Sequence, residues 1–275
     1  MRLATISRST PMRRKAPSAP LGDDLARVRA LEVLRSMPAF SACTEEALQE
    51  FSREMRPQGV RRGQRLFRAG DKVERFYLIA SGLFKMLREV PGGRQVVFEV
   101  RGSGQPLGAC IAVDQCLSPC TAQAASDATV FSAAVPSLRR LFGKHPSLSQ
   151  ALWGEVADCL RSAREMQSCM ALSVEERLAR VFSQLAGRFG ERRGPEIRLP
   201  RIVTRQDLAD MVGATIETTI RTLSHWKKRG IYRDEEGTMV LVWESESSQK
   251  CPGCGPNEKA CEHTGCLPEA SSNLV

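Results

Sequence analysis

The sequence contains no long apolar run and no recognisable export signal. None of its stretches reaches the ~18 consecutive apolar residues of a membrane-spanning helix, so we expect no such helix. The first twenty residues are basic and contain three prolines, but they lack the apolar centre of a signal peptide. We therefore expect a cytoplasmic protein. In that reducing compartment, its ten cysteines indicate metal or redox chemistry rather than disulfides.

Positive charge is the strongest feature of the composition. The 275 residues include 40 Lys and Arg against 31 Asp and Glu, which gives a formal net charge of +9 and a pI near 9.3. Such an excess favours a polyanionic partner, nucleic acid before a membrane surface. The length predicts two domains, and residues 1–24 read as a disordered basic arm.

The first predicted domain, at residues 25–145, is rich in strands. Helical periodicity at residues 21–55 gives way to short apolar stretches that alternate with glycine-containing turns. Strands this closely spaced indicate a compact antiparallel barrel or roll, which we take to be an effector domain. The expected strands lie at residues 65–67, 76–80, 83–87 and 95–100, with a further pair within 121–135.

A long helix is predicted at residues 146–172. Its apolar residues follow a 4-3-4-3-4 spacing, which makes a coiled-coil seam of about three heptads. A seam this narrow favours a homodimer, with packing inside one chain as the alternative. The seam residues are Leu152, Val156, Cys159, Ala163, Met166 and Met170.

Residues 173–243 carry the signals of a helix-turn-helix. Thr204 followed by Asp207 matches a capping box at the start of a short helix. Gly213 supplies a tight turn, and Thr215 can cap the next helix. Two strand-like segments after that helix, at residues 231–233 and 238–242, read as a wing hairpin.

The spacing along the second helix of this motif separates two faces. Thr219, Leu223 and Trp226 share one side and should pack inward, whereas Glu217, Arg221 and Ser224 share the other. An exposed arginine can donate two hydrogen bonds to guanine, and a carboxylate can accept one from cytosine. We expect contacts to DNA phosphates from Arg201, Thr204, Arg205, Thr215, Thr218, Lys227 and Lys228.

The stretch from Thr204 to Leu223 resembles the helix-turn-helix of the Crp/Fnr regulators. The strand-rich region, with turns at Gly70-Asp71, Ser81-Gly82 and residues 104–108, resembles that family's cyclic-nucleotide-type β-roll. The likeness covers about residues 35–243. It implies an α+β fold with an N-terminal β-roll, a long dimerisation helix and a C-terminal winged helix-turn-helix. It further implies a non-enzymatic homodimer that binds a double-stranded DNA operator and contacts RNA polymerase.

The resemblance also assigns positions to single residues of the reading face. Glu217 and Arg221 stand at the family's base-reading positions. Ile216 stands where the Crp branch carries an arginine, so the chain is more similar to the Fnr branch. Ile216 and Ile220 flank this face and are expected to contact thymine methyl groups, with Ser224 completing the set.

The residues expected to hold a cyclic nucleotide are missing. The family's sites resemble Gly-Glu followed about ten residues later by Arg-Ser, and this chain has Gly108-Ala109 and Pro119-Cys120 instead. Without the glutamate and the arginine, cyclic AMP loses its charged partners, which argues against it as a ligand. The same region holds Cys110, Cys116 and Cys120, which either line the pocket or serve as small buried hydrophobes.

The tail at residues 244–275 combines a polar linker with a cysteine cluster. The spacing C-x2-C-x6-C-x4-C indicates a metal site formed by Cys251, Cys254, Cys261 and Cys266. A structural zinc would take four thiolates, or three with His263. An iron–sulfur cluster would take all four, and a thiol tail without metal is the third interpretation. Resemblance to Fnr-type regulators favours a [4Fe–4S] cluster, although residues 1–41 contain no cysteine motif of the kind many of them carry.

We therefore expect a DNA-binding regulator that responds to redox state, oxygen or nitric oxide through this tail rather than to cyclic AMP. One alternative is a cyclic-nucleotide-type module that acts through a protein partner, and another is a regulator whose tail binds only a structural zinc. A thiol redox enzyme is disfavoured, because the Cys251-Pro-Gly-Cys254 motif lacks a surrounding βαβ unit.

Overall fold

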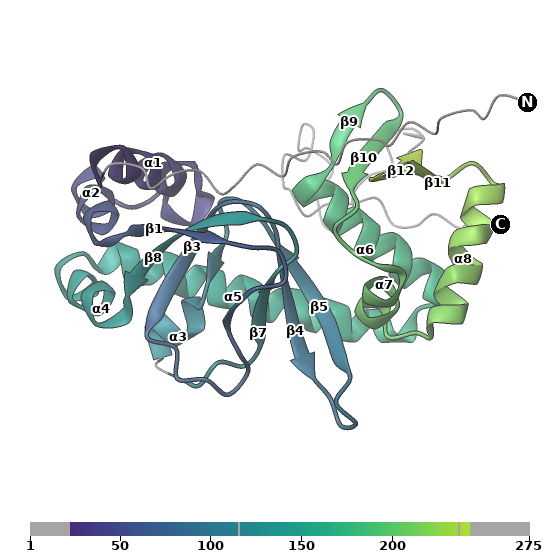
Figure 1. The fold of residues 1–275 in the computed structure, drawn as a ribbon, viewed down its shortest axis with the longest axis horizontal. Helices are drawn as coiled ribbons and strands as arrows, with labels where there is room; N and C mark the ends of the chain where they lie inside the picture. Colours follow the sequence, from purple (N-terminus) through teal and green to yellow (C-terminus); the bar gives the residue numbers. More distant parts are fainter. Residues whose placement is uncertain (1–22, 115, 236, 243–275) are drawn as a thin grey trace, which may run out of the picture.

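The structure, a computed structural model, describes residues 23–114, 116–235 and 237–242 (Figure 1). The chain begins with α1 (Asp23–Ser36), a 3-10 turn η1 (Pro38–Phe40) and α2 (Glu45–Glu54). The continuous helical periodicity predicted at residues 21–55 is thus broken. Met37 is extended, at φ −86° and ψ 122°, because the proline ring that follows disfavours a helical conformation there.

Two four-stranded antiparallel sheets form the predicted roll (Figure 1). One has the order β1 (Arg56–Val60), β8 (Ala128–Ala134), β3 (Arg75–Ser81), β6 (Pro106–Leu107). The other has the order β2 (Arg65–Phe67), β7 (Thr121–Ala124), β4 (Phe84–Glu89), β5 (Gln95–Arg101). Buried side chains from both sheets, including Ile79, Phe84 and Val130, fill the space between them. The antiparallel roll expected from the sequence is confirmed.

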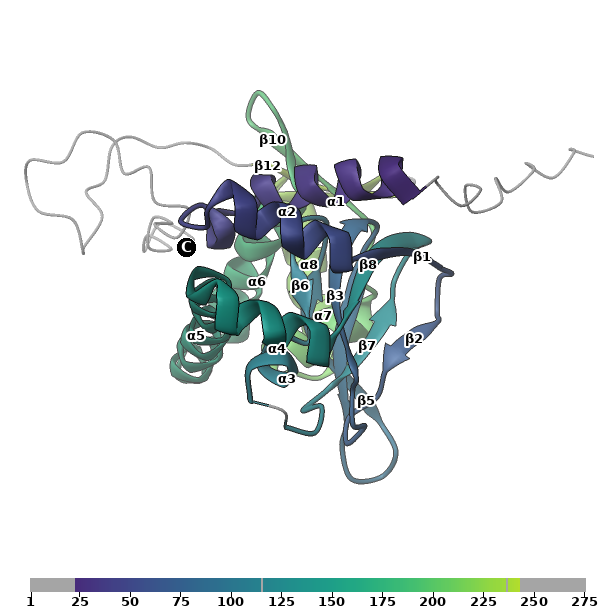
Figure 2. The ribbon, with the colours of Figure 1, turned by 90° about the vertical axis from the view of Figure 1, so that its left-hand side faces the viewer.

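A second core lies against the sheet that contains β3 and β8. Phe51 of α2, Phe76 of β3 and Phe131 of β8 are fully buried there. The helices α3 (Ala109–Asp114), α4 (Val135–Lys144) and the first turns of α5 (Pro146–Ser168) complete it. Figure 2 shows α1, α2, α4 and α5 gathered on this side of the roll.

Beyond α5 and a 3-10 turn η2 (Cys169–Ala171), the chain forms a second domain. Its elements are α6 (Val174–Phe189), β9 (Glu191–Arg193), β10 (Glu196–Pro200), α7 (Arg205–Val212), α8 (Ile216–Lys228), β11 (Tyr232–Glu235) and β12 (Thr238–Val242). The predicted wing is β11 and β12, which join β10 and β9 in a four-stranded sheet. The strands β9 and β10 were not predicted. None of the described helices is long and apolar enough to span a bilayer.

Candidate nucleic-acid interface

The helix-turn-helix consists of α7 and α8, and its local geometry follows from the sequence. Thr204 caps α7 by accepting a hydrogen bond from the Asp207 backbone N–H, and the Asp207 carboxylate accepts from the Thr204 N–H at 2.6 Å. Gly213 ends α7 in the left-handed conformation, at φ 62°. Thr215 then caps α8. The capping box and the turn glycine predicted from the sequence are confirmed.

The two faces predicted for α8 are also confirmed. Thr219, Leu223 and Trp226 are buried, at 0%, 3% and 3% exposure. The Trp226 indole donates to Glu175 of α6 at 2.6 Å, which fixes the recognition helix against the domain. Glu217 and Arg221 are exposed on the opposite side.

The other predicted base-reading residues lie around these two. Ile220 is 46% exposed, an unusual state for an isoleucine, and Ser224 is exposed with its hydroxyl donating to the Ile220 carbonyl at 2.8 Å. Ile216, in the first turn of α8, is partly exposed. The face therefore combines an acid, a guanidinium and apolar groups within three turns, which are the chemistries that major-groove edges bind.

The predicted phosphate contacts fall into two groups. Lys227 and Lys228 are exposed at the end of α8, and Thr204 and Thr215 are exposed helix caps with Thr218 partly exposed beside them. Arg201 and Arg205, in contrast, are both paired with Asp234 of β11. Arg205 also donates to the Tyr232 hydroxyl at 2.9 Å. Sequence analysis missed this arrangement, because its partners are about 30 residues apart in the chain.

Asp234 is held ionised by its partners. Burial opposes its charge, but hydrogen bonds from Tyr232 and Arg201 and the charge of Arg205 outweigh burial and lower its pKa. Burial, together with the hydrogen bond to Asp234, raises the pKa of Tyr232 to about 12. Two cations expected to face DNA therefore share a single carboxylate within the protein.

The predicted dimer seam on α5 needs one correction. Leu152 is fully buried in the core of its own domain, and Val156 packs against the same core. Trp153 and Leu160, which the prediction omitted, are the exposed apolar residues, at 50% and 54%. The first turns of α5 cover the roll, so Leu152 is not available to a partner chain, whereas Trp153 and Leu160 are.

The remaining seam residues divide along the helix. Cys159 and Ala163 are exposed, next to Leu160. Met166 packs against the core of the second domain. Met170 is 51% exposed, and its sulfur accepts from Arg177 at 3.3 Å.

The position expected for a cyclic nucleotide is surrounded by the chain's own charged groups. Arg101 of β5 is 12% exposed, and its guanidinium donates to Glu99 at 3.1 Å and to the Pro106 carbonyl at 2.7 Å. Glu99 also pairs with Arg188 of α6 at 3.2 Å. Burial raises the pKa of Glu155, on α5, against the opposing charge of Arg101.

The three cysteines of this region are free thiols and partly buried. Burial and the neighbouring Cys116 raise the pKa of Cys110 to about 11. Burial, followed by the nearby Cys110, raises the pKa of Cys120 to about 12. Thiols held protonated in this way are weak nucleophiles, which supports the interpretation of Cys110 and Cys120 as small hydrophobes.

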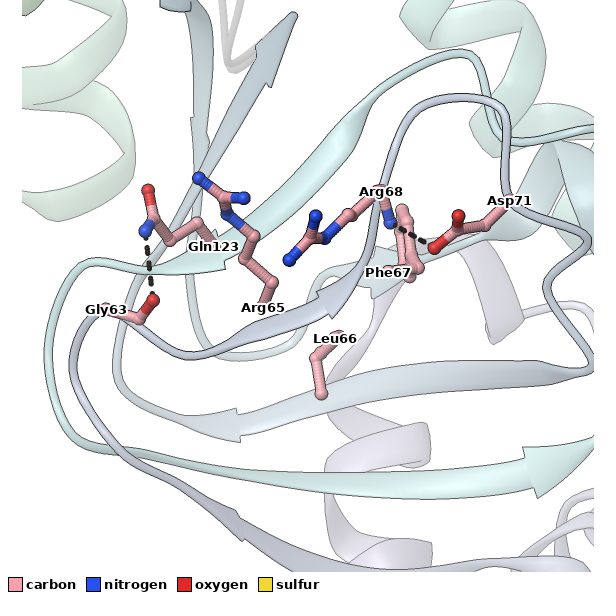
Figure 3. Close-up of a pocket in the computed structure, with 7 residues that line it drawn as sticks. All are labelled: Gly63, Arg65, Leu66, Phe67, Arg68, Asp71 and Gln123. Carbon is pink, nitrogen blue, oxygen red and sulfur yellow. Dashed lines mark hydrogen bonds between the residues drawn. The ribbon is translucent and has the colours of Figure 1, made fainter.

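An open cleft of about 460 Å³ lies elsewhere on the roll, lined by β2, the residues that flank it and Gln123 of β7 (Figure 3). Arg65 and Arg68 line it together with Gln123, which donates to the Gly63 carbonyl at 2.9 Å. Asp71 is engaged by the Arg68 backbone N–H at 2.8 Å. The cleft is shallow and polar, unlike an enclosed ligand pocket.

The predicted metal site cannot be located on this fold. Cys251, Cys254, Cys261, Cys266 and His263 lie outside the described residues, as does most of the predicted N-terminal arm. Within the described part of the chain, no three His, Cys, Asp or Glu side chains form a group that could hold a metal ion.

Comparison with known proteins places both domains. Residues 57–145 match the family described as the cyclic nucleotide-binding domain, and residues 176–244 match the Crp-like helix-turn-helix domain. The chain is 28% identical over 216 residues to the CRP-like cAMP-activated global transcriptional regulator of Mycobacterium tuberculosis, covering 78% of this chain and 96% of that protein. It is 28% identical over 177 residues to the fumarate and nitrate reduction regulatory protein of Escherichia coli, covering 64% of this chain and 70% of that protein. The fold is similar to that of FixK2 from Bradyrhizobium japonicum, with a TM-score of 0.60 at 20% identity over 70% of this chain and 99% of that one.

Proposed function

Because this chain belongs to the Crp/Fnr family of DNA-binding transcription regulators, we propose that it reads its operator through the exposed face of α8. Arg221 donates to a guanine and Glu217 accepts from a cytosine, with Ile216, Ile220 and Ser224 beside them. Thr204, Thr215, Thr218, Lys227 and Lys228 hold the phosphate backbone. RNA polymerase is the further partner that the family suggests.

One observation carries this proposal. The same helix buries Thr219, Leu223 and Trp226 and leaves Glu217 and Arg221 exposed, so its reading groups are presented by a rigid scaffold. The basic side chains of Lys227 and Lys228 continue the surface beyond the last turn. A helix face that contacts only solvent does not require an acid, an arginine and an exposed isoleucine together.

Selection from random double-stranded DNA tests the proposal. The full-length protein should enrich one sequence with two-fold symmetry, and Arg221→Ala should lose the preference for one guanine in each half-site. Arg35→Ala is the matched control, because Arg35 pairs with Glu45 in the roll domain, away from α8. Failure of the wild-type protein to enrich any sequence would contradict the proposal.

The dimer forms through α5. Trp153 and Leu160, with Cys159 and Ala163, make the apolar surface that a second copy would cover. Two symmetric half-sites require two reading helices, and this surface supplies the contact between them. Sedimentation of Leu160→Glu should give a monomer, and a variant that remains dimeric would place the interface elsewhere.

The signal is sensed by the tail. The four cysteines begin nine residues after Val242, the last residue of β12, and their donor set suits an iron–sulfur cluster or a zinc ion. A cluster bound there would supply chemistry responsive to oxygen or nitric oxide. Loss of the bound centre is then expected to change the population of the DNA-competent dimer.

An absorption spectrum of anaerobically purified protein distinguishes the two centres. A cluster gives visible thiolate-to-iron bands that disappear in air, whereas a colourless protein with bound zinc supports a structural tail. Cys254→Ser should abolish either centre. Cyclic AMP is not the signal, because Ala109 and Pro119 replace the family's charged ligands.

A further inference from the structure

The roll domain contacts the helix-turn-helix through the hairpin of β4 and β5. Leu87, Val97 and Val100 of this hairpin are buried in the same core as Leu208 and Met211 of α7. Figure 1 shows the two strands reaching from the roll toward α7. The hairpin therefore contributes side chains to the cores of both domains.

Two ion pairs lie across this contact. Lys85 of β4 pairs with Asp207, in the first turn of α7, and their side chains are only 18% and 11% exposed. Arg94, in the turn before β5, pairs with Asp210 at 2.8 Å, and the Asp210 side chain is 2% exposed. The turn that places Arg94 needs its glycines, because Gly92 and Gly93 have φ angles of 91° and 78°.

Each carboxylate is shared between its own helix and the hairpin. The Asp207 oxygen that faces Lys85 also accepts the capping bond from the Thr204 N–H. The Asp210 oxygen that faces Arg94 also accepts from Gln206 at 2.9 Å. Both acids are thus fixed in place, and neither can turn away when the domain approaches another anion.

The position of these two carboxylates is electrostatically unfavourable for a helix that approaches DNA phosphates. In a helix-turn-helix the first helix crosses the DNA backbone, and Asp207 lies three residues from Thr204, an expected phosphate contact. A charge within about 8 Å of a phosphate, the Debye length at physiological ionic strength, is only partly screened from it. Without a cation beside them, Asp207 and Asp210 would repel the operator.

We propose that Lys85 and Arg94 of the roll hairpin are positioning residues for operator binding. They neutralise Asp207 and Asp210 and so remove the electrostatic repulsion between α7 and the DNA phosphates. This inference rests on the proposed function. It makes the DNA-binding surface depend on a loop of the effector domain. A displacement of the hairpin would expose two carboxylates beside the phosphates and weaken binding.

A charge-rescue experiment on the full-length protein tests this. Operator affinity is measured by fluorescence anisotropy for the wild type, Lys85→Met, Asp207→Asn and the double variant. Lys85→Met should weaken binding about fivefold at low salt, by one uncompensated charge near the backbone. Asp207→Asn keeps an oxygen for the Thr204 N–H and should bind more tightly than the wild type. The double variant should return to within about twofold of the wild type, because no carboxylate remains to be neutralised.

The Arg94–Asp210 pair provides a second test with less risk of misfolding. Arg94 is 61% exposed, so its loss leaves the core intact. Arg94→Gln should weaken binding less than Lys85→Met, and the loss should shrink as salt is raised. Arg35→Gln, which removes an exposed ion pair between α1 and α2, is the matched control and should bind as the wild type does.

The outcomes separate three interpretations. Normal operator binding by Lys85→Met, with thermal melting as a check of folding, would overturn the inference. A double variant as weak as Lys85→Met would make the hairpin a mechanical clamp and overturn the charge argument. Tighter binding by Lys85→Met would show the contact to be inhibitory. A wild type that binds no operator contradicts the proposed function itself, which is a separate result.

Discussion

The helix-turn-helix and the roll match the sequence pattern of their family to different degrees. On α7 and α8 the caps, the turn glycine, the buried face and the exposed Glu217 and Arg221 are all present. In the roll, the strands are present, but Ala109 and Pro119 stand where the family pattern leads us to expect the charged ligands. Arg101 and Glu99 pair with each other there.

The two regions hold their charged groups in different ways. Reading a DNA sequence requires fixed groups on a rigid helix, and the buried Thr219, Leu223 and Trp226 hold α8 in place. The roll, in contrast, pairs its charged groups with one another and with the second domain, as Glu99 does with Arg101 and Arg188. The comparison predicts that single substitutions in the scaffold of α8 will have larger effects than substitutions of charged groups in the roll away from the β4–β5 hairpin.

The largest expected effect is on stability. Trp226→Ala should lower the free energy of unfolding by about 3–5 kcal/mol, because it removes a buried aromatic ring and leaves a cavity. Trp226 packs 5.9 Å from Phe182, between ring centres, and is 3% exposed. Chemical denaturation measures the change. Phe98→Ala is the control, since Phe98 is 45% exposed, and an equal loss in both variants would contradict the packing argument.

Specific DNA binding should suffer the next largest loss. Arg221→Ala is expected to cost about 1–3 kcal/mol of operator binding, because a bidentate contact to guanine disappears. Binding to random DNA should change little by comparison. Titration of both DNAs by anisotropy checks this, and an equal loss on both would reduce Arg221 to a phosphate contact.

Most of the helix-turn-helix was predictable because its signals are local. Thr204, Asp207, Gly213 and Thr215 lie within one short segment, and each acts on the backbone beside it. The register of α5 was not predictable in the same way. The apolar spacing finds a stripe, but only the packing of the roll decides that Leu152 is covered and Trp153 is exposed.

The ion pairs between residues far apart in the chain could not be predicted from the sequence. Lys85 and Asp207 are 122 residues apart, and Arg201 and Asp234 are 33 apart. No spacing rule connects such residues, because their proximity follows from the packing of whole domains. The strands β9 and β10 were missed because charged residues fill β9, which is exposed along its length.

A smaller effect is expected from the acid that holds two of the predicted phosphate contacts. Asp234→Asn should release Arg201 and Arg205, and operator binding should become more salt-dependent, with the slope of log K against log salt rising by about 1 per new phosphate contact. Affinity measured at several salt concentrations gives that slope. Asp24→Asn, at an exposed ion pair on α1, is the control. An unchanged slope would mean that the two arginines stabilise the wing and do not contact DNA phosphates.

The smallest effect should come from the roll, and it depends on pH. Burial raises the pKa of Glu155 above its unfolded value of 4.5, with Glu99 adding to the rise and Arg101 and Arg188 opposing it. The folded state therefore binds a proton more readily than the unfolded state, so the contribution of Glu155 is favourable below pH 4.5 and is lost as pH rises through the folded pKa. Glu155→Gln cannot ionise, and it should melt slightly above the wild type at neutral pH and equally at pH 4.5. Glu165→Gln, at an exposed position of the same helix, should melt as the wild type does throughout. If the Glu155→Gln difference persisted in acid, it would arise from packing rather than charge, and the roll would be as tightly constrained as the helix that reads DNA.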